Sequence, residues 1–226
     1  MKLNLIGLKF FKILVTLTIP VLISIALIRI LLTPIFTAVE YRMPYFPEDR
    51  YGFSFEERLK YGQITRRFLV SDQGEDVLRD LEFSTGEPLY LDREISHLVD
   101  VKNVLQGAFT AWWVSLGLFL GGLGGIVFLQ GQENLGLTLS RGGWLTVGLV
   151  IFLLVFSVLS FNTLFTRFHQ VFFEGDSWLF RYSDTLIRLF PIRFWQDVFI
   201  LFGLLTLLIG GLIGWFSPRI KFGSIR

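Results

Sequence analysis

Four long runs of apolar residues constrain this chain more than any other feature of its sequence. They cover residues 13–36, 104–129, 142–165 and 198–216. A transmembrane helix needs about 20 mostly apolar residues, and each run is close to or above that length. Because lipid offers the backbone no hydrogen-bond partners, such runs cross a bilayer as helices. The sequence therefore predicts an all-α membrane protein with four transmembrane helices in a single integral membrane domain, residues 1–226.

The basic residues around these runs predict how the chain is oriented. They flank both termini and the connection between the second and third runs: Lys2, Lys9, Lys12, Arg141, Arg219, Lys221 and Arg226. Cytoplasmic loops carry an excess of lysine and arginine, so both termini are predicted to be cytoplasmic. Residues 37–103 then form an extracytoplasmic cap, and residues 166–197 form a second extracytoplasmic segment. The first run is too long for a signal peptide and has no cleavage site, so we expect it to be retained.

Composition excludes several kinds of site. The chain has no cysteine, which removes disulfides, thiolate nucleophiles and cysteine-ligated metals. With only two histidines, a zinc site is not expected either, and nothing in the sequence indicates a cofactor. The net charge is +2 and no basic stripe alternates with aromatic residues, so nucleic acid is not an expected partner.

The cap is predicted to be mostly helical. Ser54 and Glu57 form a capping-box pattern ahead of apolar residues at helical spacing. Asp92 has the character of an N-cap, and the helix that begins at Arg93 is predicted to continue without a break into the second span.

The two histidines are the strongest chemical signal. His97 lies just before the second span and His169 just after the third, so the topology puts both at the outer membrane interface. At helical spacing Arg93, His97 and Asp100 share a face, and Asp100 is one turn from His97, where a carboxylate can orient the ring. Phe172, Phe173, Asp176 and Trp178 follow His169 in the sequence. Each histidine could be an interfacial residue without a role, but the pair favours a shared site.

Three further features allow a structural and a functional interpretation. Arg29 interrupts the first run, where it either faces a site or extends toward the interface. Gly117, Gly121 and Gly125 predict close helix packing in the second span. The segment 184–195 mixes arginines with aromatic residues, which favours interfacial anchoring over a substrate entrance.

At five stretches the chain resembles the lipoprotein intramolecular transacylases of bacteria. These stretches cover most of the predicted outer segments: LLTPIFTAVEYR (31–42), YGFSFEERL (51–59), EISHLVDVKNV (94–104), FHQVFFEGDSWLF (168–180) and LIRLFPIRFWQD (186–197). The resemblance implies a plasma-membrane enzyme with four spans and an extracellular cap, and catalytic histidines at His97 and His169. It also implies a diacylated bacterial lipoprotein as substrate, whose sn-2 acyl chain moves to the α-amine of its N-terminal cysteine.

The residues near the histidines suit that chemistry. Two histidines can act as base and acid when an amine attacks an ester. Arg93 or Lys102 could stabilise the oxyanion, and Tyr41, Phe172, Phe173, Asp176 and Trp178 could form the substrate pocket. Two alternatives stay open at this point: a membrane lipid-ester hydrolase that uses the same histidines, and a non-enzymatic protein whose cap binds a partner. The sequence does not indicate an oligomeric state.

Overall fold

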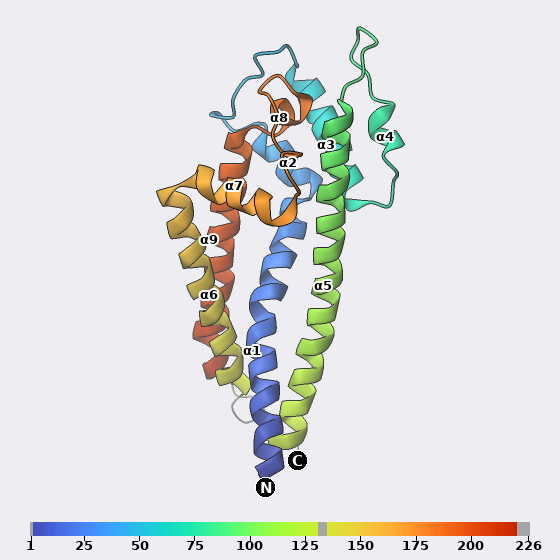
Figure 1. Cartoon of the computed structure of the whole chain (residues 1–226). Coiled ribbons are helices and arrows are strands. Elements are labelled where there is room, and N and C mark those ends of the chain that lie inside the picture. Colours follow the sequence, from blue (N-terminus) through green and yellow to red (C-terminus); the bar gives the residue numbers. More distant parts are fainter. Residues whose placement is uncertain (1, 131–134, 221–226) are drawn as a thin grey trace. The chain divides into compact units, whose positions relative to one another are not determined.

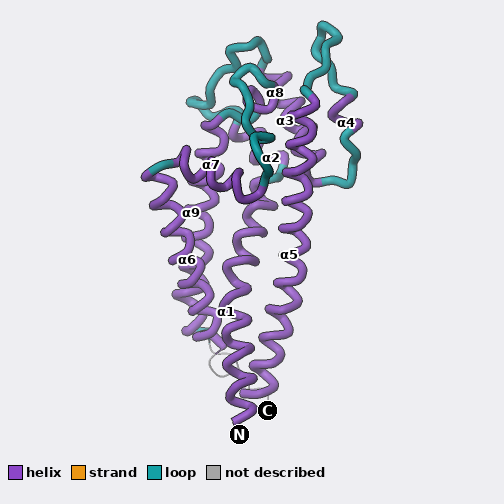
Figure 2. The backbone as a smooth tube through the Cα atoms, in the orientation of Figure 1, coloured by secondary structure: helices purple, strands orange, loops and turns teal. Residues whose placement is uncertain are grey.

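The fold was analysed in a computed structural model that describes residues 2–130 and 135–220. Within these ranges the chain is helical, with one isolated bridge between Glu82 and Pro88 and no extended strand. Figures 1 and 2 show the helices, which have these bounds: α1 (Lys2–Leu31), α2 (Pro34–Glu40), α3 (Phe55–Val70), α4 (Asp76–Arg79), α5 (Asp92–Gln130), α6 (Leu135–Leu159), α7 (Phe161–Phe172), α8 (Thr185–Leu189), α9 (Ile192–Phe216) and the short 3₁₀ helix η1 (Ser217–Arg219).

Four of these helices are long and apolar enough to cross a membrane, which confirms the predicted fold class. The qualifying segments are Asn4–Leu31, Asp92–Leu129, Leu135–Leu159 and Ile192–Arg219. Two helix ends differ from the predicted runs. α1 ends at Leu31 rather than Phe36, and α6 ends at Leu159 rather than Phe165. In both places a new helix begins within three residues, with Pro34 at the start of α2 and Ser160 as the non-helical residue before α7.

The chain divides into two compact units. The membrane unit contains Met1–Ile28, Phe109–Val158 and Ile200–Arg226, and the cap unit contains Arg29–Ala108 and Leu159–Phe199. Helices α1, α5 and α9 each contribute residues to both units. Arg29 lies in the last turn of α1 and is partly buried in the cap unit, so both interpretations of this residue stay open.

Glycines bring the helices of the membrane unit close together, but not at all of the predicted positions. A Cβ atom at Gly122 would lie 2.7 Å from Val15, and one at Gly143 would lie 2.5 Å from the backbone nitrogen of Gly214. By contrast, a Cβ atom at Gly117 or Gly121 would meet nothing within 4 Å. The predicted role for these two glycines is therefore wrong, whereas Gly125 does pack against Phe11. The face of α5 that packs closely against another helix is therefore not the face that carries Gly117 and Gly121.

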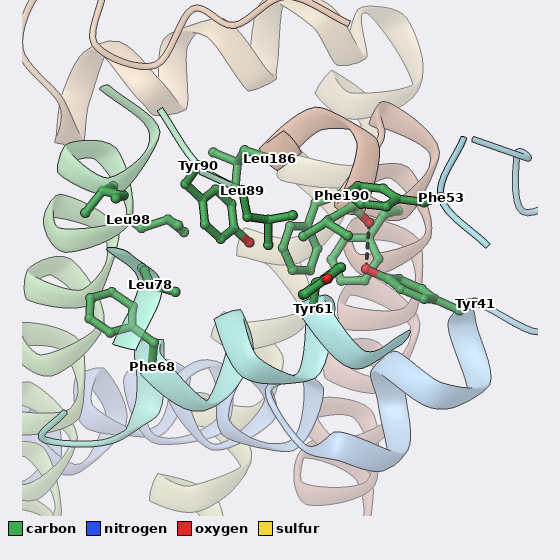
Figure 3. Close-up of a cluster of buried hydrophobic side chains, with 13 residues drawn as sticks. Tyr41, Phe53, Tyr61, Phe68, Leu78, Leu89, Tyr90, Leu98, Leu186 and Phe190 are labelled. Atoms are coloured by element: carbon green, nitrogen blue, oxygen red, sulfur yellow. Dashed lines mark hydrogen bonds between the residues drawn. The ribbon is translucent and has the colours of Figure 1, made fainter. Parts of the chain in front are cut away.

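The cap unit has its own hydrophobic core, shown in Figure 3. Its fully or nearly buried members come from α3, α4, α5, α8, α9 and the segments that connect the helices: Tyr41, Phe53, Tyr61, Phe68, Leu78, Leu89, Tyr90, Ile95, Leu98, Leu186, Leu189, Phe190 and Phe194. Ser54 and Glu57 form the predicted capping box at the start of α3. The hydroxyl group of Tyr41 donates to the carbonyl oxygen of Leu189 at 2.7 Å, the dashed contact in Figure 3.

The segment 184–195 is part of this core, so the prediction of interfacial anchoring is wrong for most of it. Leu186, Leu189 and Phe190 are buried there. Arg188 forms a buried ion pair with Asp49 at 2.9 Å and lies over the ring of Phe53. A buried arginine of this kind is stabilised by its carboxylate partner, which was not apparent from the local sequence.

Candidate active site

His97 lies on the second turn of α5, and the start of that helix fixes its position. The side chain of Glu94 accepts from the backbone nitrogen of Leu91 at 2.8 Å, which caps the helix. Asp92, the predicted N-cap, instead accepts from Arg79 at 2.7 Å. Ile95 and Leu98 point into the cap core, and His97 itself is only 5% exposed. α5 then continues unbroken to Gln130, as predicted.

His169 lies on α7, where its own helix orients the ring. The Nδ1 atom lies 2.8 Å from the carbonyl oxygen of Phe165, four residues earlier. A carbonyl oxygen can only accept, so Nδ1 carries the proton and Nε2 is left with a free lone pair. This arrangement leaves Nε2 as the nitrogen able to take up a proton.

The cap unit brings the two histidine rings together although they are 72 residues apart in the sequence (169 − 97). Their centroids are 6.1 Å apart and the ring planes differ by 18°. Phe173 contacts both rings, with its centroid 4.7 Å from that of His97 and 5.5 Å from that of His169. Trp178 covers His169 at 4.9 Å, and Phe180 meets the edge of His97 at 5.3 Å. The rings therefore share an aromatic surround.

This surround lowers the pKa of both histidines, which favours their neutral forms at pH 7. α5 has 39 residues, nearly twice what a bilayer needs, and its charged first turns belong to the cap unit, so His97 lies outside the spanning part of the helix. Burial and then the nearby His169 lower the pKa of His97 to about 4. Burial also lowers the pKa of His169, and the bond to Phe165 opposes this shift. The Nδ1 atom of His97 is buried without a hydrogen-bond partner, which is costly unless a bound molecule satisfies it.

Residues 173–184 form a strap that covers the histidines, and hydrogen bonds hold its C-terminal end in place. Asp184 is buried, and its Oδ2 atom accepts from Arg93 at 2.6 Å and from the backbone nitrogen of Arg181 at 2.8 Å. Glu94 is also buried and accepts from the backbone nitrogen of Leu186 at 2.7 Å. These bonds tie the strap to the same turns of α5 that carry His97.

Several residues predicted to support the histidines lie elsewhere in the cap unit. Lys102 donates to the carbonyl oxygen of Gln73 at 2.5 Å and lies over the ring of Phe68. Tyr41 is in the cap core. Phe172 packs on Phe168 and is largely exposed, as is Asp176. Because Nδ1 of His97 has no partner, Asp100 does not orient the ring through that atom.

Arg93, Phe173 and Trp178 are the predicted supporting residues that lie at the site, with Arg93 binding Asp184 and lying 6.0 Å from the ring of Phe180. Sequence reasoning missed Phe165 and Phe180. Phe165 is one helical turn before His169, and its ring centroid is 4.2 Å away. That spacing could have been recognised if α7 had been predicted as a separate helix. Nothing in the local sequence indicated that Phe180 meets His97.

The arrangement suits proton transfer at a poorly hydrated carbonyl. One neutral imidazole can accept a proton from a reacting group, and the imidazolium that forms can return that proton directly or through the second ring, because the two rings are close together. Aromatic walls limit the access of water as a competing nucleophile. Among the described residues no group of three or more metal-ligating side chains is present, and the site offers no serine or cysteine nucleophile.

Comparison with known proteins places the chain in a family. A model of the lipoprotein intramolecular transacylase Lit family matches residues 10–195. An uncharacterized protein from Aquifex aeolicus is 34% identical over 185 residues, which cover 82% of each chain. The membrane integral lipoprotein intramolecular transacylase Lit from Bacillus cereus has the same fold, with a TM-score of 0.72 at 18% identity over 94% of each chain.

A second structure of the Bacillus cereus protein, a histidine-to-alanine variant, gives a TM-score of 0.74 at 19% identity over 97% of this chain and 96% of the other. With four apolar helices of spanning length, the chain is a multi-pass membrane protein. The family model matches most of its residues, so the chain belongs to the lipoprotein intramolecular transacylase Lit family.

Proposed function

We propose that this protein is an intramolecular acyltransferase that acts on diacylated bacterial lipoproteins. The sn-2 acyl chain of the diacylglyceryl group moves to the α-amine of the N-terminal cysteine, which leaves a lyso-lipoprotein. The observation that carries the proposal is the pair of histidine rings, with His97 buried and His169 partly buried, whose centroids are 6.1 Å apart in an aromatic surround. Membership of a family named for this reaction supports it.

The proposed reaction begins when the amine nitrogen attacks the ester carbonyl carbon. Nε2 of His169 takes the proton that the nitrogen loses, because Nδ1 is already bound to Phe165. The tetrahedral intermediate collapses as the bond between the carbonyl carbon and the sn-2 oxygen breaks. The proton on His169 then passes through His97, which takes it up at one ring nitrogen as it releases another proton to that oxygen, so the amide and the free hydroxyl form and both rings end neutral.

The amine and the ester belong to one substrate molecule, so the protein has to supply a smaller part of the rate enhancement. Holding two reacting groups in contact can contribute several kcal/mol, roughly 7–11 in well-oriented intramolecular reactions. The site then needs to exclude water and to move protons. Phe173, Trp178 and Phe180 serve the first purpose in this proposal, and the histidines serve the second.

The test uses the purified protein in lipid nanodiscs with a synthetic diacylated lipopeptide whose first residue is a lipidated cysteine. Mass spectrometry of the product should show an N-acylated lyso-lipopeptide of unchanged total mass, identified by its fragments. Free fatty acid with a deacylated peptide would indicate a hydrolase instead. An unaltered lipopeptide would favour the non-enzymatic interpretation of the cap.

A further inference from the structure

Helix α7 has an apolar face that the described structure covers only in part. Its apolar residues share about a third of the helix circumference: Phe161, Leu164, Phe165, Phe168, Val171 and Phe172. The opposite face carries Thr163, Thr166, Arg167 and Gln170. None of the residues of α7 is fully buried, and Val171 is 76% exposed.

The apolar face is divided between two surroundings. Toward the start of α7, Phe161 packs on Phe199 at 5.5 Å and Phe165 packs on His169 and Trp195. Farther along, Phe168, Val171 and Phe172 are 42%, 76% and 47% exposed. Three large apolar side chains on one face of a helix form an apolar surface that is unfavourable in contact with water.

Connectivity identifies what covers that surface. A single residue, Ser160, separates α7 from α6, which is long and apolar enough to cross a membrane. α7 therefore begins where a transmembrane helix leaves the bilayer. Figure 1 shows α7 lying crosswise to the first turns of α5, rather than continuing along a spanning direction. A helix with these two faces at this depth matches the amphipathic helices that lie in the membrane interface.

We propose that α7 lies in the lipid interface, with Phe168, Val171 and Phe172 among the acyl chains of the surrounding leaflet and with Arg167 and Gln170 facing water and headgroups. The occupant of the apolar surface is thus the bilayer itself. This inference does not depend on the proposed reaction. It also predicts how deep His169 lies in the membrane. The ring lies on the border between the two faces of α7, which corresponds to the level of the lipid glycerol esters.

The absence of cysteine from the chain makes the test direct. Val171→Cys and its neighbour Gln170→Cys are each spin-labelled in the full-length protein, reconstituted in vesicles of phosphatidylethanolamine and phosphatidylglycerol. Collision rates with oxygen, which concentrates in lipid, and with a water-soluble nickel complex are then measured. The label at position 171 should show a several-fold higher ratio of oxygen to nickel collisions than the label at position 170.

Equal collision rates of the two labels with the nickel complex would overturn the proposal, because both faces of α7 would then be in water. Low accessibility of position 171 to both reagents would overturn it as well, because protein rather than lipid would cover the face. Phe172→Cys replaces Val171→Cys if the latter does not accumulate. Neither residue has a part in the proposed reaction, and Val171 is 76% exposed, so a failure of acyl transfer and a failure of this proposal are separate results.

Discussion

At the scale of single residues, the site depends on which nitrogen of each histidine carries a proton. His169 has a defined tautomer because a carbonyl oxygen fixes its Nδ1 atom. His97 has no such partner at Nδ1, and the neighbouring ring lowers its pKa further. The two histidines are therefore not equivalent, which is a reason to expect different roles in proton transfer.

This difference predicts a titration that can be followed directly, since the chain has two histidines. Nitrogen-15 NMR of selectively labelled protein should show both rings neutral at pH 7, with His97 protonating only near pH 4. In His169→Ala the pKa of His97 should rise, because one cause of its lowering is removed. A His97 ring that titrates near its ordinary value of 6.5 in the intact protein would contradict the described environment.

The same shifts set the direction of a stability change. The unfolded state binds more protons than the folded state between about pH 4 and 6.5, so the free energy of unfolding should fall as the pH is lowered through that window. Thermal unfolding of the protein in detergent at pH 7 and pH 5 checks the sign. The double variant His97→Ala/His169→Ala should lose part of this dependence.

At the scale of elements, the strap of residues 173–184 is what keeps Phe173, Trp178 and Phe180 on the histidines. One end continues from α7, and the other is bound through Asp184 to Arg93 and to the backbone of Arg181. Removing one partner of a buried, charge-assisted bond leaves the other partner unsatisfied. The strap should then loosen over the rings without any change to the histidines themselves.

Asp184→Ala should accordingly lower the rate of acyl transfer by about tenfold, which corresponds to a loss of roughly 1.4 kcal/mol in transition-state stabilisation. The protein should still accumulate in the membrane. Free fatty acid should increase relative to transferred product, because water gains access. Glu174→Ala is the matched control, an exposed acid on the same strap. Equal activities of the two variants would show that the strap does not position the site.

A second element-scale prediction concerns the ion pair that links α8 to the loop before α3. Asp49→Ala leaves Arg188 buried without its carboxylate, at a cost of about 3–5 kcal/mol. The melting temperature should fall clearly in a thermal-shift measurement. Glu48→Ala, the exposed neighbour, should leave it unchanged. If both variants melt alike, the pair is not a stabilising part of the cap core.

The sequence predicted some elements well because their signals are local. The start of α3 follows from Ser54 and Glu57, and the continuity of α5 follows from a long stretch without proline. The end of α6 was missed because Phe161, Leu164 and Phe165 continue the apolar run beyond Ser160. Gly117 and Gly121 were misassigned because spacing shows which residues share a face but not what that face meets.

The same limit applies to the site. His97 and His169 were predicted to form a pair because the expected topology put both at one interface and both lie in stretches that resemble the family. Lys102, near His97 in the sequence, and Tyr41, an aromatic residue of the predicted cap, were also assigned to the site, yet their partners Gln73 and Leu189 come from other elements. Partners such as Asp49 and Arg188, 139 residues apart, follow only from the tertiary fold.

At the scale of the whole molecule, the predicted orientation puts both termini on one side of the membrane and the cap on the other. The basic termini are expected in the cytoplasm and the cap outside. In a chain without cysteine, Lys60→Cys in α3 should react with a membrane-impermeant thiol reagent in intact cells, because this position is exposed on the cap. A cysteine added after Arg226 should react only after lysis. Labelling of the C-terminal cysteine in intact cells would reverse the orientation.

The central claim is that His97 and His169 act as one unit in acyl transfer, and one measurement tests it most directly. A reporter lipoprotein is expressed with the wild-type protein, His97→Ala, His169→Ala or the double variant at matched membrane levels, and its N-terminal peptide is analysed by mass spectrometry. Each single variant should reduce the lyso-form by at least about 100-fold, and the double variant should be no worse than either. Substantial lyso-lipoprotein from either single variant would contradict a pair in which both histidines are essential.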